Sequence, residues 1–229
     1  MQRSFGQFCP VALASEVLAQ RWTLLIIREL VAGSSRFSDI RRGVPRISAS
    51  LLKERLETLE RSEIVEKRRS GKSNVYEYFI TESGAELKSI IAQIGEWGQR
   101  WARDIKPDDL DPGWLVWTIH RRLNTVEMPP GRTVIQFEFL GEPKNHRYFW
   151  IVNNDGDVEV CVKNPGYDID LEVRTTARVL AEVWRGIRSV RQELRAGAIH
   201  LKGKPSLKKA FPKWLLLSVY APIKKKRSI

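Results

Sequence analysis

Cysteine, histidine and long apolar runs are all scarce in this chain of 229 residues. Its two cysteines, Cys9 and Cys161, are too few for a disulfide framework and agree with a reducing compartment. No histidine has a partner at metal-ligand spacing, and no Gly-rich phosphate loop or nucleophile elbow occurs. We therefore expect that the protein is not an enzyme and that it binds neither a metal ion nor a cofactor.

The apolar residues are also distributed unlike those of a membrane or secreted protein. No apolar run approaches the roughly 20 residues that a transmembrane helix needs. The first ten residues lack the apolar core of a signal peptide. These features predict a cytoplasmic protein without a membrane span.

Positive charge is abundant and unevenly placed. The net charge of +12 divides into +5 before residue 108, −2 over residues 108–201 and +9 from residue 202 onward. The length suits two domains, and residues 106–113, rich in proline and aspartate, have the composition of a linker. We expect domains over residues 1–105 and 106–229. The basic tail is assigned no function, because a solvated charged terminus is the commoner meaning.

Residues 36–80 have the pattern of a winged helix-turn-helix. Ser48 can cap a helix in which Leu52, Leu56 and Leu59 recur at helical spacing, and Ile47 can pack against Leu52 as a hydrophobic staple. Two β-rich runs, residues 64–69 and 75–80, flank turn-forming residues and predict a basic hairpin. We expect the capped helix to enter the major groove of double-stranded DNA and the hairpin to meet phosphates. The residues expected to contact DNA are Arg36, Arg46, Ser48, Ser50, Lys53, Arg68, Arg69 and Lys72.

A long helix is expected after the hairpin, from a cap at Thr81 to about residue 103. Its apolar positions follow three-four spacing, which suits either a core face or a subunit interface. We favour a homodimer interface, because a small winged domain offers this helix little core to cover. The residues expected there are Leu87, Ile90, Ile94, Trp97 and Trp101.

Cys9 precedes Pro10 at the expected start of the first helix. Backbone amides at a helix N-terminus favour a thiolate, so Cys9 could sense oxidants or electrophiles. The alternative is a small buried apolar residue, and we favour burial because free cysteine is often buried.

A set of short motifs is spread over about residues 8–102. They are Cys9-Pro10-Val11, the run from Arg21 to Leu30, the run from Arg36 to Ile40, Ile47-Ser48, Leu51-Leu52, Arg55-Leu56, Leu59-Glu60, Thr81 and Gly84. Through these motifs the first half resembles the HxlR family of prokaryotic transcription regulators. The resemblance implies a dimeric winged-helix repressor or activator, in a family with members in which the cysteine of the Cys-Pro pair senses electrophiles or oxidants.

The second half predicts an α+β domain. A helix over residues 112–124 precedes β-rich runs at residues 133–139, 147–152, 158–162 and 169–173, whose short separations predict antiparallel hairpins. Helices are expected at residues 176–185, 189–196 and 206–218, with one more strand at residues 198–201.

The last third of this half contains a second set of motifs, namely Asp170-Leu171, Thr176, Leu180, Val183-Trp184-Arg185-Gly186, Gly197, Ile199, Leu201 and Gly203. Through them residues 114–217 are similar to the sterol-carrier-protein-type domain. The similarity implies a mainly antiparallel five-stranded sheet, covered by helices, around an apolar tunnel for a lipid-like or small apolar ligand. The residues expected to bind the ligand are Trp114, Phe137, Trp150, Leu180 and Trp184.

Three functions remain open at this point. The favoured one is a DNA-binding transcription regulator controlled by a ligand of the second domain. The others are a thiol-based redox regulator acting through Cys9 and a lipid carrier or docking protein whose winged helix contacts proteins.

Overall fold

The computed structural model describes residues 4–71 and 75–226 and divides into two compact units, residues 1–97 and 98–229. Lys72, one of the expected DNA contacts, lies outside the described residues. The boundary falls inside helix α5 (Glu82–Trp101), so the last turn of this helix belongs to the second unit. Each unit has its own apolar core and is described by itself.

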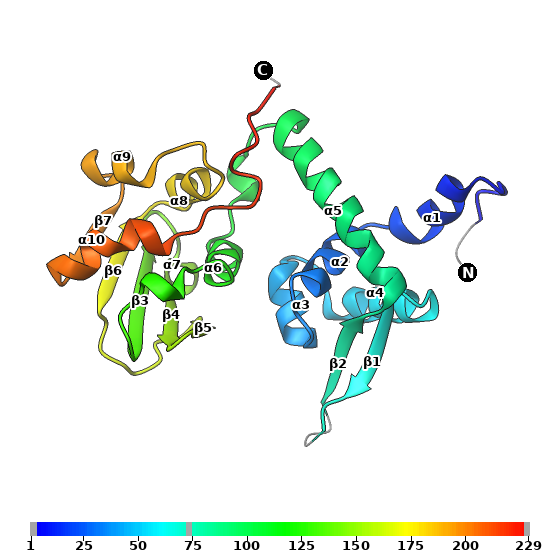
Figure 1. Ribbon diagram of the computed structural model, residues 1–229, viewed down its shortest axis with the longest axis horizontal. Coiled ribbons are helices and arrows are strands. Elements are labelled where there is room, and N and C mark those ends of the chain that lie inside the picture. The colour runs from blue at the N-terminus through cyan, green and yellow to red at the C-terminus, as the bar shows by residue number, and fades with distance from the viewer. Residues whose placement is uncertain (1–3, 72–74, 227–229) are drawn as a thin grey trace. The chain divides into compact units, whose positions relative to one another are not determined.

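The first unit has the element order of a winged helix-turn-helix (Figure 1). Its elements are α1 (Pro10–Leu18), α2 (Thr23–Val31), α3 (Phe37–Gly43), α4 (Ala49–Arg61), β1 (Val65–Arg69), β2 (Tyr76–Ile80) and most of α5. The side chains of Leu52, Leu56 and Leu59 are fully buried with those of Ile26 and Ile40. The predicted inward face of the capped helix is confirmed.

Hydrogen bonds at the helix starts agree with the predicted caps. The Ser48 hydroxyl accepts a hydrogen bond from the Leu51 amide at 3.2 Å, and the Thr81 hydroxyl accepts one from the Gly84 amide at 3.1 Å. Gly84 also lets α5 approach the hairpin closely, because an added Cβ would lie 2.3 Å from the Ile64 carbonyl oxygen. The start of α5 is therefore held against the base of the hairpin.

The second unit is built on a five-stranded sheet in the order β5-β4-β3-β6-β7. The strands are β3 (Arg132–Phe139), β4 (Tyr148–Asn154), β5 (Asp157–Cys161), β6 (Leu171–Thr175) and β7 (His200–Gly203). The helices are α6 (Pro112–His120), α7 (Lys144–Arg147), α8 (Ala177–Trp184), α9 (Val190–Arg195) and α10 (Pro205–Trp214), with 3₁₀ turns η1 (Pro107–Asp109) and η2 (Thr125–Glu127).

The sheet is mixed. Three of its neighbouring pairs are antiparallel, but β6 runs parallel to β3, so the expectation of a hairpin before this strand is wrong. The chain crosses over after β5 instead of turning back beside it. The crossing is fixed where the Asp170 amide donates to the Val134 carbonyl at 3.0 Å and the Val134 amide donates to the Asp170 carboxylate at 2.8 Å.

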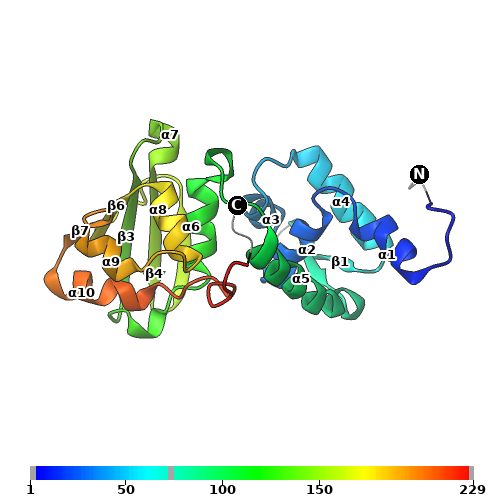
Figure 2. The same ribbon diagram turned by 90° about the horizontal axis from the view of Figure 1, so that it is seen from above.

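The core of the second unit lies between the helices and one face of the sheet (Figure 2). Alternate residues of β3, namely Ile135, Phe137 and Phe139, are fully buried and belong to this core with residues of α6, α8 and α10. The opposite face carries a smaller cluster around Val134 and Trp150. The helices therefore cover one side of the sheet.

Within the described ranges, no single helix is long and apolar enough to cross a membrane. Helices α1 and α2 reach that length and composition only as a pair bent by 83°.

Candidate nucleic-acid interface

Helices α3 and α4 and the turn between them form the helix-turn-helix. Arg46 in this turn has a φ of 74°, a left-handed conformation that reverses the chain ahead of Ser48. The first turn of α4 contains no acidic residue. Its unpaired amides and the helix dipole therefore present an uncompensated positive end, which favours contact with phosphate or with base edges.

Two expected DNA contacts project from the start of α4. Ser50 is exposed, and Lys53 is 70% exposed and pairs weakly with Glu57 at 3.9 Å. The hydroxyl of Ser48 is used in the cap and also lies 3.1 Å from the Ser50 hydroxyl. Ser48 therefore positions the helix, whereas Ser50 and Lys53 are available to a partner.

The hairpin presents basic side chains on both faces. Arg68 and Arg69 lie at the end of β1 opposite Glu77 and Tyr76. The Arg68 guanidinium pairs with Glu66 and stacks 5.2 Å from the centre of the Phe79 ring. Since an exposed ion pair contributes only about 0–1 kcal/mol, phosphate can replace Glu66 as the partner of Arg68 at little cost.

Arg36 has a different environment. It precedes α3, and its guanidinium lies 3.3 Å from the Glu77 carboxylate of β2, where an isolated β-bridge also joins the two residues. Because its side chain is 64% exposed, Arg36 can still meet DNA while it ties α3 to the hairpin.

Three further basic residues are exposed around the same elements, and sequence reasoning did not select them. Arg41 and Arg42 occupy the last turn of α3, and Lys67 lies on β1 with its ammonium 4.3 Å from the Tyr76 ring centre. The three arginines at positions 41, 42 and 46, shortly before the cap at Ser48, are the signal that could have identified the first two.

The first unit also exposes an apolar surface away from its core. On α5, Ile90, Ile94 and Trp97 form an apolar stripe and are 44%, 45% and 62% exposed. Trp101, in the last turn of α5 and so in the second unit, is 42% exposed. Leu87 is partly buried against the core. Helix α1 buries no residue, and it exposes Val11 and Leu13.

Cys9 lies at the N-cap of α1 and is exposed. The expectation that it is buried is wrong, because α1 packs only Val17 and Leu18 against the core of the first unit. A thiol in this position is accessible to oxidants and electrophiles.

The expected ligand-binding residues of the second unit do not form one site. Trp114 and Trp184 line a common cavity of about 470 Å³, which also meets Leu110, Leu115 and Arg185. Phe137 and Leu180 are 0% and 1% exposed within the core. Trp150 lies on the opposite face of the sheet. Of the five expected residues, only Trp114 and Trp184 therefore remain in the candidate ligand site.

Known proteins match the first unit and the residues that follow it. The family model for the HxlR-like helix-turn-helix matches residues 17–106. The HTH-type transcriptional regulator YvaP of Bacillus subtilis is 36% identical over 108 residues, which cover 46% of this chain and 97% of that protein. YodB, an HTH-type transcriptional regulator of the same organism, is 36% identical over 95 residues, which cover 41% of this chain and 85% of YodB.

Solved structures of YodB include a reduced form, a diamide-treated form and a quinone-bound form. The reduced form aligns at 32% identity with a TM-score of 0.38, covering 44% of this chain and all of that one. Because the sequence match with YvaP spans nearly all of that regulator, the chain belongs, through its first half, to the HxlR-like helix-turn-helix family of transcriptional regulators.

Proposed function

We propose that this protein is a homodimeric, sequence-specific regulator of transcription that reads double-stranded DNA with α4. The observation that carries the proposal is the N-terminal turn of α4, which is capped, free of acidic residues and flanked by exposed Ser50 and Lys53. Exposed Arg41 and Arg46 lie just before it, and Arg68 and Arg69 project from the hairpin. In this arrangement α4 selects bases and the other basic residues hold phosphates.

The apolar stripe of α5 supports the homodimer. Ile90, Ile94 and Trp97 would each lose contact with water in an isologous interface, in which the same surface of both subunits meets. Exposed apolar residues of α1 could extend that surface. Two subunits then present two copies of α4 to half-sites about one helical turn apart.

We assign the second unit to ligand control. Its five-stranded sheet with helices on one face agrees in outline with the sterol-carrier type of domain, and its cavity of about 470 Å³ falls in the usual range for small-molecule sites. Helix α5 carries the apolar stripe and continues into the second unit. A ligand held beside the last turn of α5 could therefore bias the dimer, and DNA and ligand would change each other's affinity by the same factor.

The direct test is titration of the full chain with duplex DNA at low and moderate salt, with and without candidate ligands. We expect binding that weakens steeply as salt rises, because phosphate contacts release counterions. A folded protein that binds no duplex at low salt would exclude the proposal. If the protein binds DNA with the same affinity in the presence and absence of a bound ligand, ligand control is excluded, but the DNA-binding function is not.

A second candidate function, redox control through Cys9, is favoured by the exposure of this thiol at the N-cap of α1. YodB has been characterised in diamide-treated and quinone-bound forms, and it is 36% identical to this chain over 95 residues. Modification of Cys9 would act at the start of α1, whose exposed Val11 and Leu13 could extend the candidate dimer surface.

For Cys9→Ser, we expect unchanged DNA affinity in reducing buffer and no response to diamide or a quinone. Wild-type protein treated in the same way should change its DNA affinity at least tenfold if Cys9 is the sensor. Cys161→Ser, which removes the partly buried thiol of the second unit, is the matched control and should respond like wild type. An unresponsive wild-type protein would exclude redox control.

A further inference from the structure

The guanidinium of Arg185 is a partly buried positive charge that lacks an anionic partner within the described ranges. Its Nε and Nη2 groups donate to Oε1 of Gln99 at 3.1 and 2.7 Å, and among residues 4–71 and 75–226 no carboxylate pairs with it. Burial lowers the pKa of Arg185 from its ordinary value. Removing a charge from water is costly unless a partner compensates it, so this arginine is poised for an anion.

Arg185 lines the cavity of about 470 Å³ in the second unit. Most of the cavity wall is apolar, with Ile105, Leu110, Trp114 and Trp184 among the lining residues. Such a cavity, with a few polar groups, is the usual form of a site for a small organic molecule. Its residues therefore suit a ligand with an apolar body and one anionic group.

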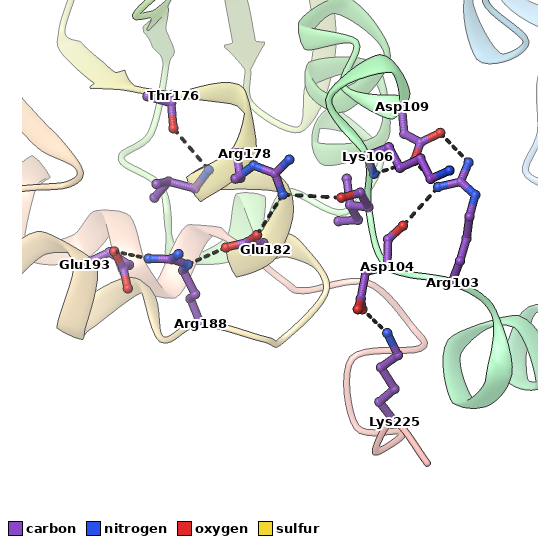
Figure 3. A network of polar contacts seen from close by, with 12 residues as sticks. Arg103, Asp104, Lys106, Asp109, Thr176, Arg178, Glu182, Arg188, Glu193 and Lys225 are labelled. Atoms are coloured by element: carbon purple, nitrogen blue, oxygen red, sulfur yellow. Dashed lines mark hydrogen bonds and ion pairs between the residues drawn. The ribbon is translucent and has the colours of Figure 1, made fainter. Parts of the chain in front are cut away.

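The acidic residues around the cavity already have cationic partners (Figure 3). Asp109 accepts a hydrogen bond from the Arg103 guanidinium at 2.7 Å and another from the Lys106 amide at 2.7 Å. Asp104 pairs with the ammonium of Lys225. Neither carboxylate is paired with Arg185, which leaves this guanidinium as the uncompensated charge of the wall.

We propose that this cavity binds an amphipathic organic carboxylate, whose carboxylate group accepts hydrogen bonds from Arg185 and whose apolar body lies against Trp114 and Trp184. The planar guanidinium matches a carboxylate in two-point geometry. A neutral ligand would leave the charge uncompensated, and a cation would be repelled. The inference rests on the proposed ligand-binding role of the second unit and names the chemical class of the ligand.

Gln99 links the proposed carboxylate site to helix α5, which carries the candidate dimer surface. It lies on the last turn of α5, is 9% exposed, and its carboxamide oxygen holds the Arg185 side chain. A carboxylate that binds Arg185 competes with this oxygen. Ligand binding would therefore act directly on the helix that carries the apolar stripe.

The test is calorimetric titration of the full chain with octanoate and with 1-octanol, which share an apolar chain and differ in the anionic group. We expect octanoate to bind at least tenfold more tightly than 1-octanol. Arg185→Gln should weaken octanoate binding by about 10- to 100-fold, as expected when a hydrogen bond to a charged group is lost, and should change 1-octanol binding less than about twofold.

Arg188→Gln is the matched control, because Arg188 is exposed, pairs with Glu182 and Glu193, and does not line the cavity. It should leave octanoate affinity unchanged. Trp184→Ala should weaken both ligands equally. If Arg185→Gln fails to fold, Arg185→Lys keeps the charge without the two-point geometry and should weaken octanoate selectively.

The proposal is overturned if octanoate does not bind, if octanoate and 1-octanol bind equally, or if folded substitutions of Arg185 leave octanoate affinity unchanged. The same samples are titrated with duplex DNA. If the protein binds DNA but does not bind octanoate, the proposed ligand class is rejected and the proposed DNA-binding function stands. If octanoate binds through Arg185 but does not change the affinity for DNA, the carboxylate site is supported and ligand control of DNA binding is excluded.

Discussion

Ile94→Glu is expected to convert a homodimer into a monomer and to weaken binding to a two-half-site duplex by at least about 100-fold. Ile94 is 45% exposed in the single subunit, so the glutamate can stay solvated there and should cost little folding stability. In an isologous interface the same substitution places two carboxylates in an apolar contact, where each costs several kcal/mol. Sedimentation or light scattering measures the mass, and a DNA titration measures the affinity.

Ala92→Glu provides the control for this substitution. Ala92 is also exposed on α5, but helical spacing places it on another side of the helix from Ile90 and Ile94. The control protein should remain a dimer with wild-type DNA affinity. A wild-type protein that is a monomer at micromolar concentration, or an Ile94→Glu protein that remains a dimer, would contradict the assigned surface.

Replacing both Arg68 and Arg69 by alanine should weaken binding to every duplex, specific or not, by about 10- to 100-fold in moderate salt. Each arginine is expected to neutralise one phosphate, and each lost contact should reduce the slope of log K against log salt by about one unit per subunit. Both side chains are exposed, so the substitutions should leave folding stability nearly unchanged. Fluorescence anisotropy at several salt concentrations measures both quantities.

A protein with Lys144 and Lys163 replaced by alanine has the same change in net charge. Both lysines are exposed in the second unit, far along the chain from the hairpin. We expect this control to keep the wild-type salt dependence. If the two double variants behave alike, the hairpin makes no specific contribution and only overall charge attracts DNA.

Local signals in the sequence were sufficient for the winged helix. Ser48 and Thr81 are caps with apolar residues at helical spacing behind them, and both caps form as predicted. Such signals depend on neighbours a few residues apart. Such local signals therefore predict where a helix or strand begins, but they do not predict which other elements it packs against.

Features that depend on distant residues were not predictable in this way. The parallel pairing of β6 with β3 follows a crossover, about which turn-forming residues carry no information. In β4, Phe149 faces the core while Trp150 faces the other side, and an unbroken run of apolar residues does not reveal that difference. Arg185 and Gln99 meet although they are 86 residues apart.

The exposure of Cys9 has a similar cause. Leu13, Val17 and Leu18 are apolar residues of α1, but the structure packs only Val17 and Leu18 against the core and leaves Leu13 51% exposed. An apolar face on a helix indicates that another element packs against it. The spacing of the apolar residues does not reveal whether that element belongs to the same subunit or to a second copy of the chain.

The central claim, that α4 reads DNA sequence, is tested most directly by selecting duplexes from a random library with the wild-type protein and with Lys53→Ala. We predict that the wild type enriches a motif of two half-sites, about one helical turn apart. Lys53→Ala should retain the spacing and lose preference at one position in each half-site, a discrimination worth about 1–3 kcal/mol. Enrichment of no motif, or of the same motif with equal preference by both proteins, would contradict the assignment of α4 as the reading helix.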